Sequence, residues 1–571
     1  MDKTSRLDTS VIIIGGGATG TGIMRDCALR GIDCILIEKD DLASGTTGRN
    51  HGLLHSGARY AVTDNESAKE CIHENKILKN IAKHCVEDTQ GLFISLPDDD
   101  LDFQKQFIES CQVAGIEAKQ LTPKEALLLE PNVNPNLIGA VQVPDGTLDP
   151  FRLCAANVLD AKENGARLLT HTHVTSLIRH QDTVLGVNCI DVRTNQKIEI
   201  FASEVINAAG IWGQNICEYA DLSIKMFPAK GSLLILDYRI NNLVINRCRK
   251  PSDADILVPG DTISLIGTTS EHIDYDKIDD LHVSAKEVDI LLSEGAKLAP
   301  IMANTRVLRA YAGVRPLVAV DDDGSGRNIS RGIVLLDHGE KDGLNGFTTI
   351  TGGKLMTSRL MAEMTTDLVA KKLNNNQECT THSRPLPGSN SASIAAKKTA
   401  SLAKPVYQSA VYRHGERAQQ FLTDNAKDQA VICECEMVTQ GEINYAINQL
   451  DVHNLVDLRR RTRLGMGPCQ GELCTYRAAG LFEECGQVSG NQSSQLLTHF
   501  LEERWKGIKP VFWGDALREA EFSYWIYEGL FGASDIPTSN MPTPNTQLEK
   551  DHVDGSQITT SQSKEKQEAT L

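Results

Sequence analysis

Four cysteines in the C-terminal third are the residues whose spacing most directly indicates chemistry. One residue separates Cys433 from Cys435, and four residues separate Cys469 from Cys474. Thiolates are soft ligands that suit zinc or an iron–sulfur cluster. Structural zinc sites usually space their cysteines by two to four residues, so the close first pair favours a [2Fe–2S] cluster over zinc.

A second pattern near the N-terminus indicates a dinucleotide site. Gly15, Gly17 and Gly20 form G-x-G-x-x-G directly after an apolar stretch at 11–14, and Glu38 follows the next apolar stretch. In this pattern the glycines allow a tight turn, close approach of the backbone to a pyrophosphate, and close helix–strand packing. A carboxylate at the position of Glu38 accepts hydrogen bonds from ribose hydroxyls and repels a 2′-phosphate, which argues against NADP.

Both NAD and FAD use such a glycine loop, and the rest of the chain favours FAD. Small polar or glycine-containing segments recur at 44–52, 207–212 and 351–354, each near a predicted strand. FAD is long enough to span separated segments of this kind, whereas NAD needs fewer. A flavin reduced by two electrons must pass them on one at a time, and an iron–sulfur cluster on the same chain is a natural relay, which supports a cluster at the four cysteines.

The charge of the chain restricts its ligands. The formal net charge is −17, which disfavours nucleic acid or an anionic membrane surface as a general partner. An anionic substrate would need a local group of cations, and Arg59, Arg315, Arg331 and Lys354 lie in motifs near predicted strand ends. His55, four residues before Arg59, is a candidate base for oxidation of an alcohol, which needs a hydride acceptor and a proton acceptor.

The composition is that of a folded globular chain. Hydrophobic residues make up 41% of the 571 residues and charged residues 23%. No apolar run approaches the length of a membrane span, and the first apolar stretch has no signal-peptide features. The fifteen cysteines are mostly isolated and odd in number, which disfavours a disulfide framework and indicates the reducing cytoplasm.

The elements that position these residues follow a mixed α/β pattern. A strand at 11–14, a helix at 20–30 and a strand at 34–38 predict a βαβ unit. Asp149 and Pro150 predict the capped start of another helix. A strand at 347–350 is expected to lead into a helix starting near Lys354. We therefore expect a Rossmann-like FAD-binding domain, an interleaved α+β substrate domain and a small C-terminal cysteine domain.

Three further stretches resemble one enzyme family. Residues 45–60, 311–316 and 351–357 resemble the FAD-dependent glycerol-3-phosphate dehydrogenases. With the four cysteines, the resemblance narrows to the catalytic A subunits of bacterial anaerobic glycerol-3-phosphate dehydrogenases. It runs from about residue 8 to about residue 531, and the cysteine segment is similar to the [2Fe–2S] domain of bacterioferritin-associated ferredoxin.

The resemblance implies the oxidation of sn-glycerol 3-phosphate to dihydroxyacetone phosphate by an FAD enzyme. It also implies a second flavoprotein subunit, an iron–sulfur subunit that links the complex to the membrane, and menaquinone or another quinone as an indirect acceptor. The expected location is peripheral, at the cytoplasmic face of the inner membrane. Residues expected at the FAD site are Gly15, Gly17, Gly20, Glu38, Thr46, Thr47, Gly48, Val174, Ala209, Gly210, Gly353 and Lys354.

The expected division of the chain has five parts. The FAD-dependent region covers 1–373, followed by a connecting segment at 374–430, a [2Fe–2S] domain at 431–490, an aromatic helical segment at 491–535 and a disordered tail at 536–571. Within the first part, FAD-binding segments at about 8–90, 150–215 and 330–373 alternate with substrate-domain segments at about 91–149 and 216–329.

Two other functions remain open at this point. Amine dehydrogenases for proline, hydroxyproline or sarcosine combine a similar flavin fold with a similar cysteine domain, but they bind a carboxylate. The second alternative is a non-catalytic metal-binding scaffold. The intact glycine loop, Glu38 and Lys354 argue against it.

Two further segments, one rich in arginine and one rich in aromatic residues, lead to separate expectations. The arginine run at 459–463 is expected to offset the charge of a cluster or to lie on a solvated helix face. In the helix expected at 516–531, Phe522, Trp525 and Ile526 lie off the main apolar stripe and could dock a partner subunit. The members of that stripe are Leu517, Ala520, Tyr524, Tyr527 and Phe531.

Overall fold

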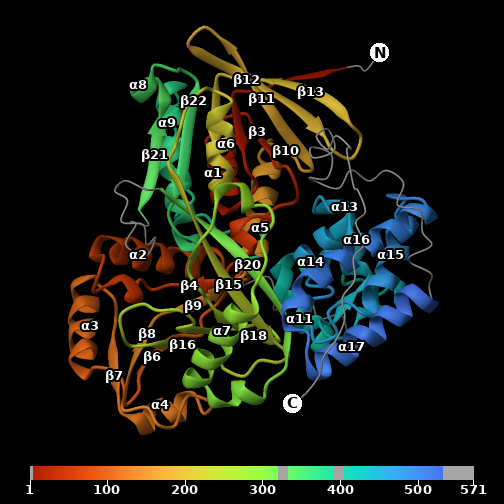
Figure 1. Ribbon diagram of the computed structural model, residues 1–571. Helices are drawn as coiled ribbons and strands as arrows, with labels where there is room; N and C mark the ends of the chain where they lie inside the picture. The colour runs from red at the N-terminus through yellow and green to blue at the C-terminus, as the bar shows by residue number, and fades with distance from the viewer. Residues whose placement is uncertain (1–3, 319–331, 391–403, 531–571) are drawn as a thin grey trace, which may run out of the picture. The chain divides into compact units, whose positions relative to one another are not determined.

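The N-terminal part of the chain is built on a six-stranded sheet, called here the nucleotide sheet (Figure 1). The structure is a computed structural model that describes residues 4–318, 332–390 and 404–530. Five strands are parallel, and β21 pairs antiparallel to β22 at the edge. In spatial order the strands are β10 (Arg167–Leu169), β3 (Cys34–Ile37), β2 (Val11–Ile14), β14 (Glu204–Asn207), β22 (Phe347–Gly352) and β21 (Ile333–Asp337).

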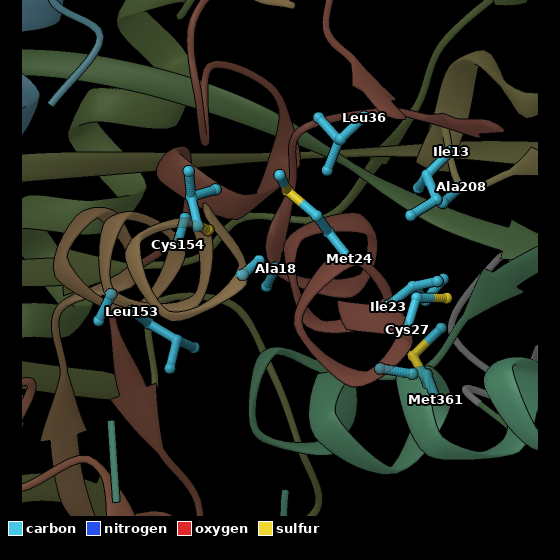
Figure 2. Close-up of a cluster of buried hydrophobic side chains, with 14 of the residues drawn as sticks. Ile13, Ala18, Ile23, Met24, Cys27, Leu36, Leu153, Cys154, Ala208 and Met361 are labelled. Carbon is cyan, nitrogen blue, oxygen red and sulfur yellow. The ribbon is translucent and has the colours of Figure 1, made fainter. Parts of the chain in front are cut away.

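Three helices cover one face of this sheet. Helix α1 (Ala18–Leu29) packs between α5 (Pro150–Glu163) and α9 (Ser358–Lys372). Figure 2 shows the apolar side chains that fill this layer. A Cβ on Gly22 would lie only 3.0 Å from the Cβ of Ala362, so the glycine allows α1 and α9 to approach closely.

The first βαβ unit and the start of α5 confirm the sequence predictions. The side chain of Asp149 accepts hydrogen bonds from the backbone N–H groups of Phe151 and Arg152 at 2.9 and 3.0 Å. Pro150 occupies the first helical position, where no N–H is required. The strand predicted before Lys354 is β22, and a short 3₁₀ turn, η6 (Leu355–Thr357), precedes α9.

A four-stranded sheet covers the opposite face. Alternate residues of β2 point to the two faces, so Ile12 and Ile14 pack on this second layer while Val11 and Ile13 face α1. The strands in order are β1 (Ser5–Asp8), β13 (Gln196–Phe201), β12 (Thr183–Asp191) and β11 (Thr172–His180).

The substrate domain is a separate mixed sheet assembled from two parts of the chain. Strand β20 pairs with β15, and α7 (Ala285–Leu298) contributes to the same apolar core. The domain is thus interleaved in sequence with the nucleotide-binding part. The strands are β6 (Gly91–Ser95), β7 (Lys119–Leu121), β8 (Gly139–Val143), β15 (Met226–Leu236), β16 (Val244–Arg247), β17 (Ile256–Gly260), β18 (Ile263–Gly267), β19 (Glu271–His272) and β20 (Val307–Val318).

Shorter elements complete this region. A three-stranded sheet contains β4 (Leu53–Leu54), β9 (Gly146–Leu148) and β5 (Val86–Glu87). The remaining helices are α2 (Asn65–Ile81), α3 (Leu101–Val113), α4 (Pro123–Leu129), α6 (Gly213–Glu218) and α8 (His338–Asp342). Among the helices of the described ranges, none has both the length and the apolar composition needed to cross a bilayer.

The cysteine domain is mainly helical. Its apolar core includes Ala410 and Phe421 from the expected connecting segment and Tyr527 from the aromatic segment. The expected tail at 536–571 lies outside the described residues. The elements are α11 (Lys404–His414), α12 (Ala426–Gln429), β23 (Val431–Cys433), β24 (Val438–Thr439), α13 (Gln440–Gln449), α14 (Leu455–Thr462), α15 (Cys474–Glu484), α16 (Gly490–Ile508) and α17 (Gly514–Tyr524).

Candidate functional site

The carboxyl ends of β2 and β14 meet where the strand order of the nucleotide sheet reverses. Gly15 has a φ angle of +117°, and a Cβ there would lie 2.5 Å from the carbonyl oxygen of Ala208. Ala209 and Gly210 follow directly, at the start of η3 (Gly210–Trp212). Ligands of open α/β sheets bind at such reversal points. The structure thus brings three of the expected FAD residues to one edge.

The N-terminus of α1 has the features of a phosphate site. The N-cap residue Gly17 offers no side-chain cap, and the N–H of Ala18 donates to Oγ1 of Thr47 at 3.0 Å. A Cβ on Gly17 would lie 2.9 Å from that oxygen, and one on Gly20 would lie 1.9 Å from the carbonyl oxygen of Gly15. Only glycine therefore leaves this backbone accessible. Exposed N–H groups at a helix start bind phosphate, so these residues fit a pyrophosphate.

Glu38 directly follows β3, and its side chain faces the glycine loop. Its Oε2 accepts a hydrogen bond from the N–H of Gly16 at 2.6 Å, and its Oε1 accepts one from the N–H of Asp40 at 2.9 Å. Burial raises the pKa of Glu38 to about 6. A carboxylate held at this point can accept hydrogen bonds from ribose hydroxyls, the role that the sequence predicts for it.

The loop after β3 is tied to the substrate domain. The hydroxyl of Thr46 donates to the carbonyl oxygen of Val314 at 2.7 Å, and that of Tyr311 donates to the carbonyl oxygen of Asn50 at 2.8 Å. A Cβ on Gly48 would lie 2.2 Å from the carbonyl oxygen of Ala43. The loop at 44–52, called here the flavin loop, is thus held to β20 by hydrogen bonds that cross between the two domains.

His55, Tyr60 and Lys354 form one group. The ring centroids of His55 and Tyr60 are 5.5 Å apart, and Nζ of Lys354 lies 4.9 Å from the Tyr60 centroid. The side chain of His55 is buried. The backbone N–H of Lys354 donates to Oγ1 of Thr357 at 2.9 Å, which holds the turn before α9. A candidate base and a candidate cation thus face the same aromatic ring.

Arg59 and Arg315 are the other two candidate cations among the described residues, and both contact residues of the substrate domain. Nη2 of Arg59 lies 3.4 Å from Oδ2 of Asp255. Nη2 of Arg315 donates to Oγ1 of Thr268 at 2.6 Å and to the carbonyl oxygen of Thr269 at 3.1 Å. Nη1 of Arg315 makes longer contacts of 3.4 Å with backbone carbonyls of β15. Arg315 is therefore anchored to the substrate sheet.

The remaining expected residues lie in three places. Arg331 is outside the described residues. The side chain of Val174 lies in the apolar core between the two sheets, so only its backbone can face a ligand. Gly353 has a φ angle of +65°, and a Cβ there would lie 2.4 Å from Sδ of Met361. This turn therefore requires glycine directly before Lys354.

The four cysteines converge from two loops. Cys433 ends β23 and Cys474 begins α15, and both are buried, whereas Cys435 and Cys469 are partly exposed. Cys469 is in hydrogen-bond contact with Cys435 and Cys474, and Cys474 also with Cys433. A Cβ on Gly467 would lie 2.4 Å from the Cβ of Cys435, so this residue must be glycine for the loops to approach.

Backbone N–H groups are directed at two of these sulfur atoms. Those of Gly465 and Glu436 interact with Cys433, and those of Gly471 and Glu472 interact with Cys469. Each of these interactions lowers the pKa of the thiol that it contacts. Metal ligation needs deprotonated cysteine, and N–H groups directed at sulfur stabilise a cluster. The donor set fits a [2Fe–2S] cluster.

Three arginines of the run at 459–463 form ion pairs with other parts of the chain. Arg460 and Arg461 both bind Asp41 of the flavin region, at 3.0 and 2.5 Å. Arg463 lies 2.9 Å from Asp261 of the substrate domain. These three arginines join the cysteine domain to the rest of the chain through largely buried ion pairs, so the expectation of a solvated helix face is wrong for them, and compensation of the cluster charge stays a prediction.

The predicted apolar stripe of the C-terminal helix is partly wrong. Ala520 and Tyr527 are buried, but Leu517 and Tyr524 are exposed, and Phe531 is outside the described residues. Ser523 is buried instead because its hydroxyl donates to Oε1 of Glu472 at 2.7 Å. Helix α17 ends at Tyr524 and continues as a π-helical turn. The hydrogen bond between Ser523 and Glu472 therefore turns a different face of the helix toward the core from the one that the apolar pattern predicts.

Two functional candidates were missed in the sequence. Tyr60 contacts both His55 and Lys354, and its signal in the sequence is its place directly after Arg59 in the segment 45–60. Asp145 holds the residue that follows His55: its buried carboxylate accepts hydrogen bonds from N–H and Oγ of Ser56, both at 2.7 Å. Burial raises the pKa of Asp145. The only local signal for it is the Pro144–Asp145–Gly146 turn sequence.

Comparison with known families agrees with this geometry. Residues 10–359 match the family described as FAD dependent oxidoreductase, and residues 431–484 match the BFD-like [2Fe-2S] binding domain. The predicted FAD fold and [2Fe–2S] domain are thereby confirmed.

Relatives and a solved structure extend the match to nearly the whole chain. The A subunit of the anaerobic glycerol-3-phosphate dehydrogenase of Escherichia coli is 64% identical over 92% of this chain and 97% of its own length. That of Haemophilus influenzae is 62% identical over 93% and 95%. The crystal structure of glycerol-3-phosphate dehydrogenase from Bacillus halodurans, complexed with FAD, shares the fold with a TM-score of 0.65 at 24% identity, covering 90% of this chain and 97% of that one. The chain therefore belongs to the FAD dependent oxidoreductases and, within them, to the family of anaerobic glycerol-3-phosphate dehydrogenase A subunits.

Proposed function

We propose that this chain oxidises sn-glycerol 3-phosphate to dihydroxyacetone phosphate with bound FAD and passes the electrons on through its [2Fe–2S] centre. The names of its relatives support the substrate. The observation that carries the proposal is the convergence of His55, Tyr60 and Lys354, from two distant motifs, beside a flavin loop tied to the substrate sheet.

Each member of this group has a task in the reaction. Bound FAD would accept the hydride from C2 of the alcohol. His55 takes the proton of the C2 hydroxyl, and its buried position excludes competing water. Lys354 stabilises negative charge on the same oxygen or on the phosphate. Tyr60 positions His55 and Lys354, because both side chains contact its ring.

The substrate phosphate needs a fixed cation. Arg315 is the best candidate because two short hydrogen bonds hold its Nη2 atom, and its longer Nη1 contacts can be exchanged for phosphate oxygens. Arg59 and Arg331 complete the proposed set. Arg59 shares Asp255 with Arg249, which lies closer to that carboxylate, at 2.7 Å.

The residues at the nucleotide site have separate proposed roles. Gly15, Gly17 and Gly20 expose the N-terminus of α1 to the pyrophosphate, and Glu38 accepts hydrogen bonds from the ribose. The flavin is proposed to contact the remaining expected residues, which are Thr46, Thr47, Gly48, Val174, Ala209, Gly210, Gly353 and Lys354.

The electrons then leave the chain. Cys433, Cys435, Cys469 and Cys474 would hold the cluster, and the partly exposed Cys435 and Cys469 mark its accessible side. The proposed acceptors are two further subunits, one a flavoprotein and the other a membrane-linking iron–sulfur protein, with menaquinone or another quinone beyond them. This arrangement would place the chain at the cytoplasmic face of the inner membrane.

Anaerobic reduction of the purified holoenzyme tests the substrate. The flavin absorption band should bleach on addition of sn-glycerol 3-phosphate and stay unchanged with proline, hydroxyproline or sarcosine. Dye-linked turnover should show the same preference. Bleaching by an amine substrate alone would support an amine dehydrogenase instead, and a colourless protein would support the scaffold alternative.

A further inference from the structure

Four arginine side chains meet between the flavin region and the cysteine domain. They are Arg49 from the flavin loop, Arg309 from β20, Arg459 from α14 and Arg504 from α16. Each interacts electrostatically with at least one other cation of this junction or with the cluster cysteines. Within the described ranges, none of the four side chains has a hydrogen-bond or ion-pair partner.

Two of these side chains are deeply buried. Arg309 is 9% exposed and Arg504 is 5% exposed. Nε and Nη1 of Arg309 and Nε of Arg504 are buried and make no hydrogen bond to a described residue. The guanidinium of Arg309 fills the space beside Gly507, where a Cβ would lie 2.7 Å from its Nε. A buried charge without a partner is strongly unfavourable, so this arrangement calls for an anion.

Several carboxylates lie near the junction, including Asp40 and Asp279 beside Arg49 and Glu519 beside Arg504, but none of the described ones forms an ion pair with the four arginines. Glu503 is the acidic group that faces Arg49, Arg309 and Arg459, but its Oε1 is bound by Lys506 at 2.8 Å. Glu472 faces Arg504, but its Oε1 accepts the hydroxyl of Ser523. Burial, together with the neighbouring arginines, lowers the pKa of both Arg309 and Arg459. Within the described residues, no carboxylate is therefore in direct contact with these four guanidinium groups.

We propose that Arg49, Arg309, Arg459 and Arg504 form a binding site for a dianionic phosphate group, separate from the substrate site. The planar guanidinium donates parallel hydrogen bonds that match the oxygens of phosphate, and several such groups around one ligand suit two negative charges. The phosphate is either a free ion or the ester group of a small metabolite.

The site is distinct from the other anionic groups of the protein. The nucleotide pyrophosphate is served by the N-terminus of α1. Arg504 lies on the side of Cys469, whereas Arg309 stands two residues before Tyr311, whose hydroxyl binds the flavin loop. The arginines thus extend from the cluster side to the flavin side of the junction.

Phosphate binding to the holoenzyme tests the proposal directly. Protein containing FAD and the cluster is dialysed into chloride buffer and equilibrated with radiolabelled inorganic phosphate. Because phosphate also fits the substrate site, the Arg315→Ala variant is measured in parallel. We expect this variant to retain one bound phosphate. Adding Arg309→Gln and Arg504→Gln to it should abolish that binding, with affinity lowered at least about tenfold. Arg518→Gln, an exposed arginine of α17, should bind as the wild type does.

Three results would overturn the proposal. One is an Arg315→Ala holoenzyme that binds no phosphate. Another is undiminished binding after the substitutions Arg309→Gln and Arg504→Gln. The third is an increase in KM for sn-glycerol 3-phosphate in Arg309→Gln as large as in Lys354→Ala, which would place these arginines in the substrate site. Arg309→Lys keeps the charge without the planar fork, and should bind phosphate more weakly than the wild type while retaining the flavin and cluster spectra.

A second titration separates the two sources of the phosphate group. With Arg315→Ala holoenzyme, sn-glycerol 3-phosphate is added as a competitor of bound inorganic phosphate. Displacement at lower concentration than unlabelled phosphate indicates a metabolite ester site, and displacement only at higher concentration indicates a site for the free ion. Both outcomes support a phosphate site, and absence of any saturable binding to compete with contradicts it.

Discussion

Arg461 and Asp41 form a buried ion pair between the cysteine domain and the flavin region. Nη2 of Arg461 lies 2.5 Å from Oδ1 of Asp41, and each side chain is 1% exposed. Arg460 binds the same carboxylate at 3.0 Å. One aspartate just after β3 therefore binds two arginines of the domain that carries the cluster cysteines, and Asp457 is a second, longer partner of Arg460, at 3.6 Å.

Removal of Asp41 should loosen this domain junction. Asp41→Ala removes the carboxylate that Arg461 binds and leaves Arg460 with only the longer contact to Asp457, and we expect a loss of about 3–5 kcal/mol in the free energy of unfolding. Urea denaturation followed by cluster absorption measures it. Asp33→Ala, which removes the partner of the exposed Arg167, should cost no more than about 1 kcal/mol. Equal effects of the two substitutions would contradict the role of the buried pair.

Lys354→Ala should retain FAD and lose turnover. The loss of one charge-assisted interaction in a desolvated site costs about 2–4 kcal/mol of transition-state stabilisation, or roughly 30- to 900-fold in kcat/KM. Steady-state kinetics with a dye acceptor measure this loss, and flavin absorption measures retention of FAD. Lys105→Ala, on the exposed face of α3, serves as control. Near-normal efficiency of Lys354→Ala would disprove its assignment.

Cys469→Ser should remove the cluster and leave flavin reduction by substrate intact. The cysteine loops and the flavin loop belong to different domains, and hydride transfer does not need the cluster. Iron content and stopped-flow reduction of the flavin test the two statements. Cys485→Ser, a cysteine of the same domain outside the set of four, should keep both. Loss of FAD from Cys469→Ser, or zinc in the wild-type protein, would contradict the assignment.

Exposed aromatic residues on either side of Ser523 are expected to bind a partner subunit. Phe522 is 64% exposed and Trp525 is 63% exposed. Aromatic side chains dominate interface energies. Phe522→Ser with Trp525→Ser should keep dye-linked activity and lose electron transfer to the reconstituted complex. Leu128→Ser, an exposed apolar residue of α4, should keep both. These substitutions are preferable to deletion, because Tyr527 packs near the cluster loop and donates to the carbonyl oxygen of Glu472.

The cysteine domain should lose stability in acid through Glu442. Burial opposes ionisation of this carboxylate, but the charge of Arg413 and hydrogen bonds from His414 and Arg413 together lower its pKa to about 2. An acid with a lowered folded-state pKa stabilises the fold above its unfolded pKa of about 4.5. That contribution, about 3 kcal/mol, is lost as the pH falls from about 4.5 to about 2.

Comparison with Glu442→Gln isolates this effect. The wild type should exceed the variant in thermal stability by the largest margin near neutral pH, and the margin should shrink between about pH 4.5 and about pH 2. Circular dichroism during heating provides the measurement, with the exposed Glu484→Gln as control. A margin that does not change with pH would show that ionisation of Glu442 does not stabilise the domain.

Local sequence patterns were enough to predict a nucleotide site and a set of cluster ligands. Gly15, Gly17 and Glu38 lie on one strand–turn–helix–strand unit, where chain connectivity alone places them together. The cysteine pairs are equally local, because each pair lies within one loop. Arg331 stays a prediction, since it lies outside the described residues.

Contacts between distant segments could be established only by the tertiary structure. The pairing of Arg461 with Asp41 spans 420 positions, and nothing near either residue indicates its partner. From the sequence, the arginine run is expected either to offset the cluster charge or to lie on a solvated helix face, and neither expectation includes its pairing with Asp41. The contact between Tyr60 and Lys354 also joins segments that are distant in sequence. The same is true of the four arginines that meet at the domain junction. The sequence determines which side chains carry charge or a reactive group, because these properties belong to single residues and short motifs. Their burial and partners depend on how separately formed sheets and helices pack, and the tertiary structure alone decides that.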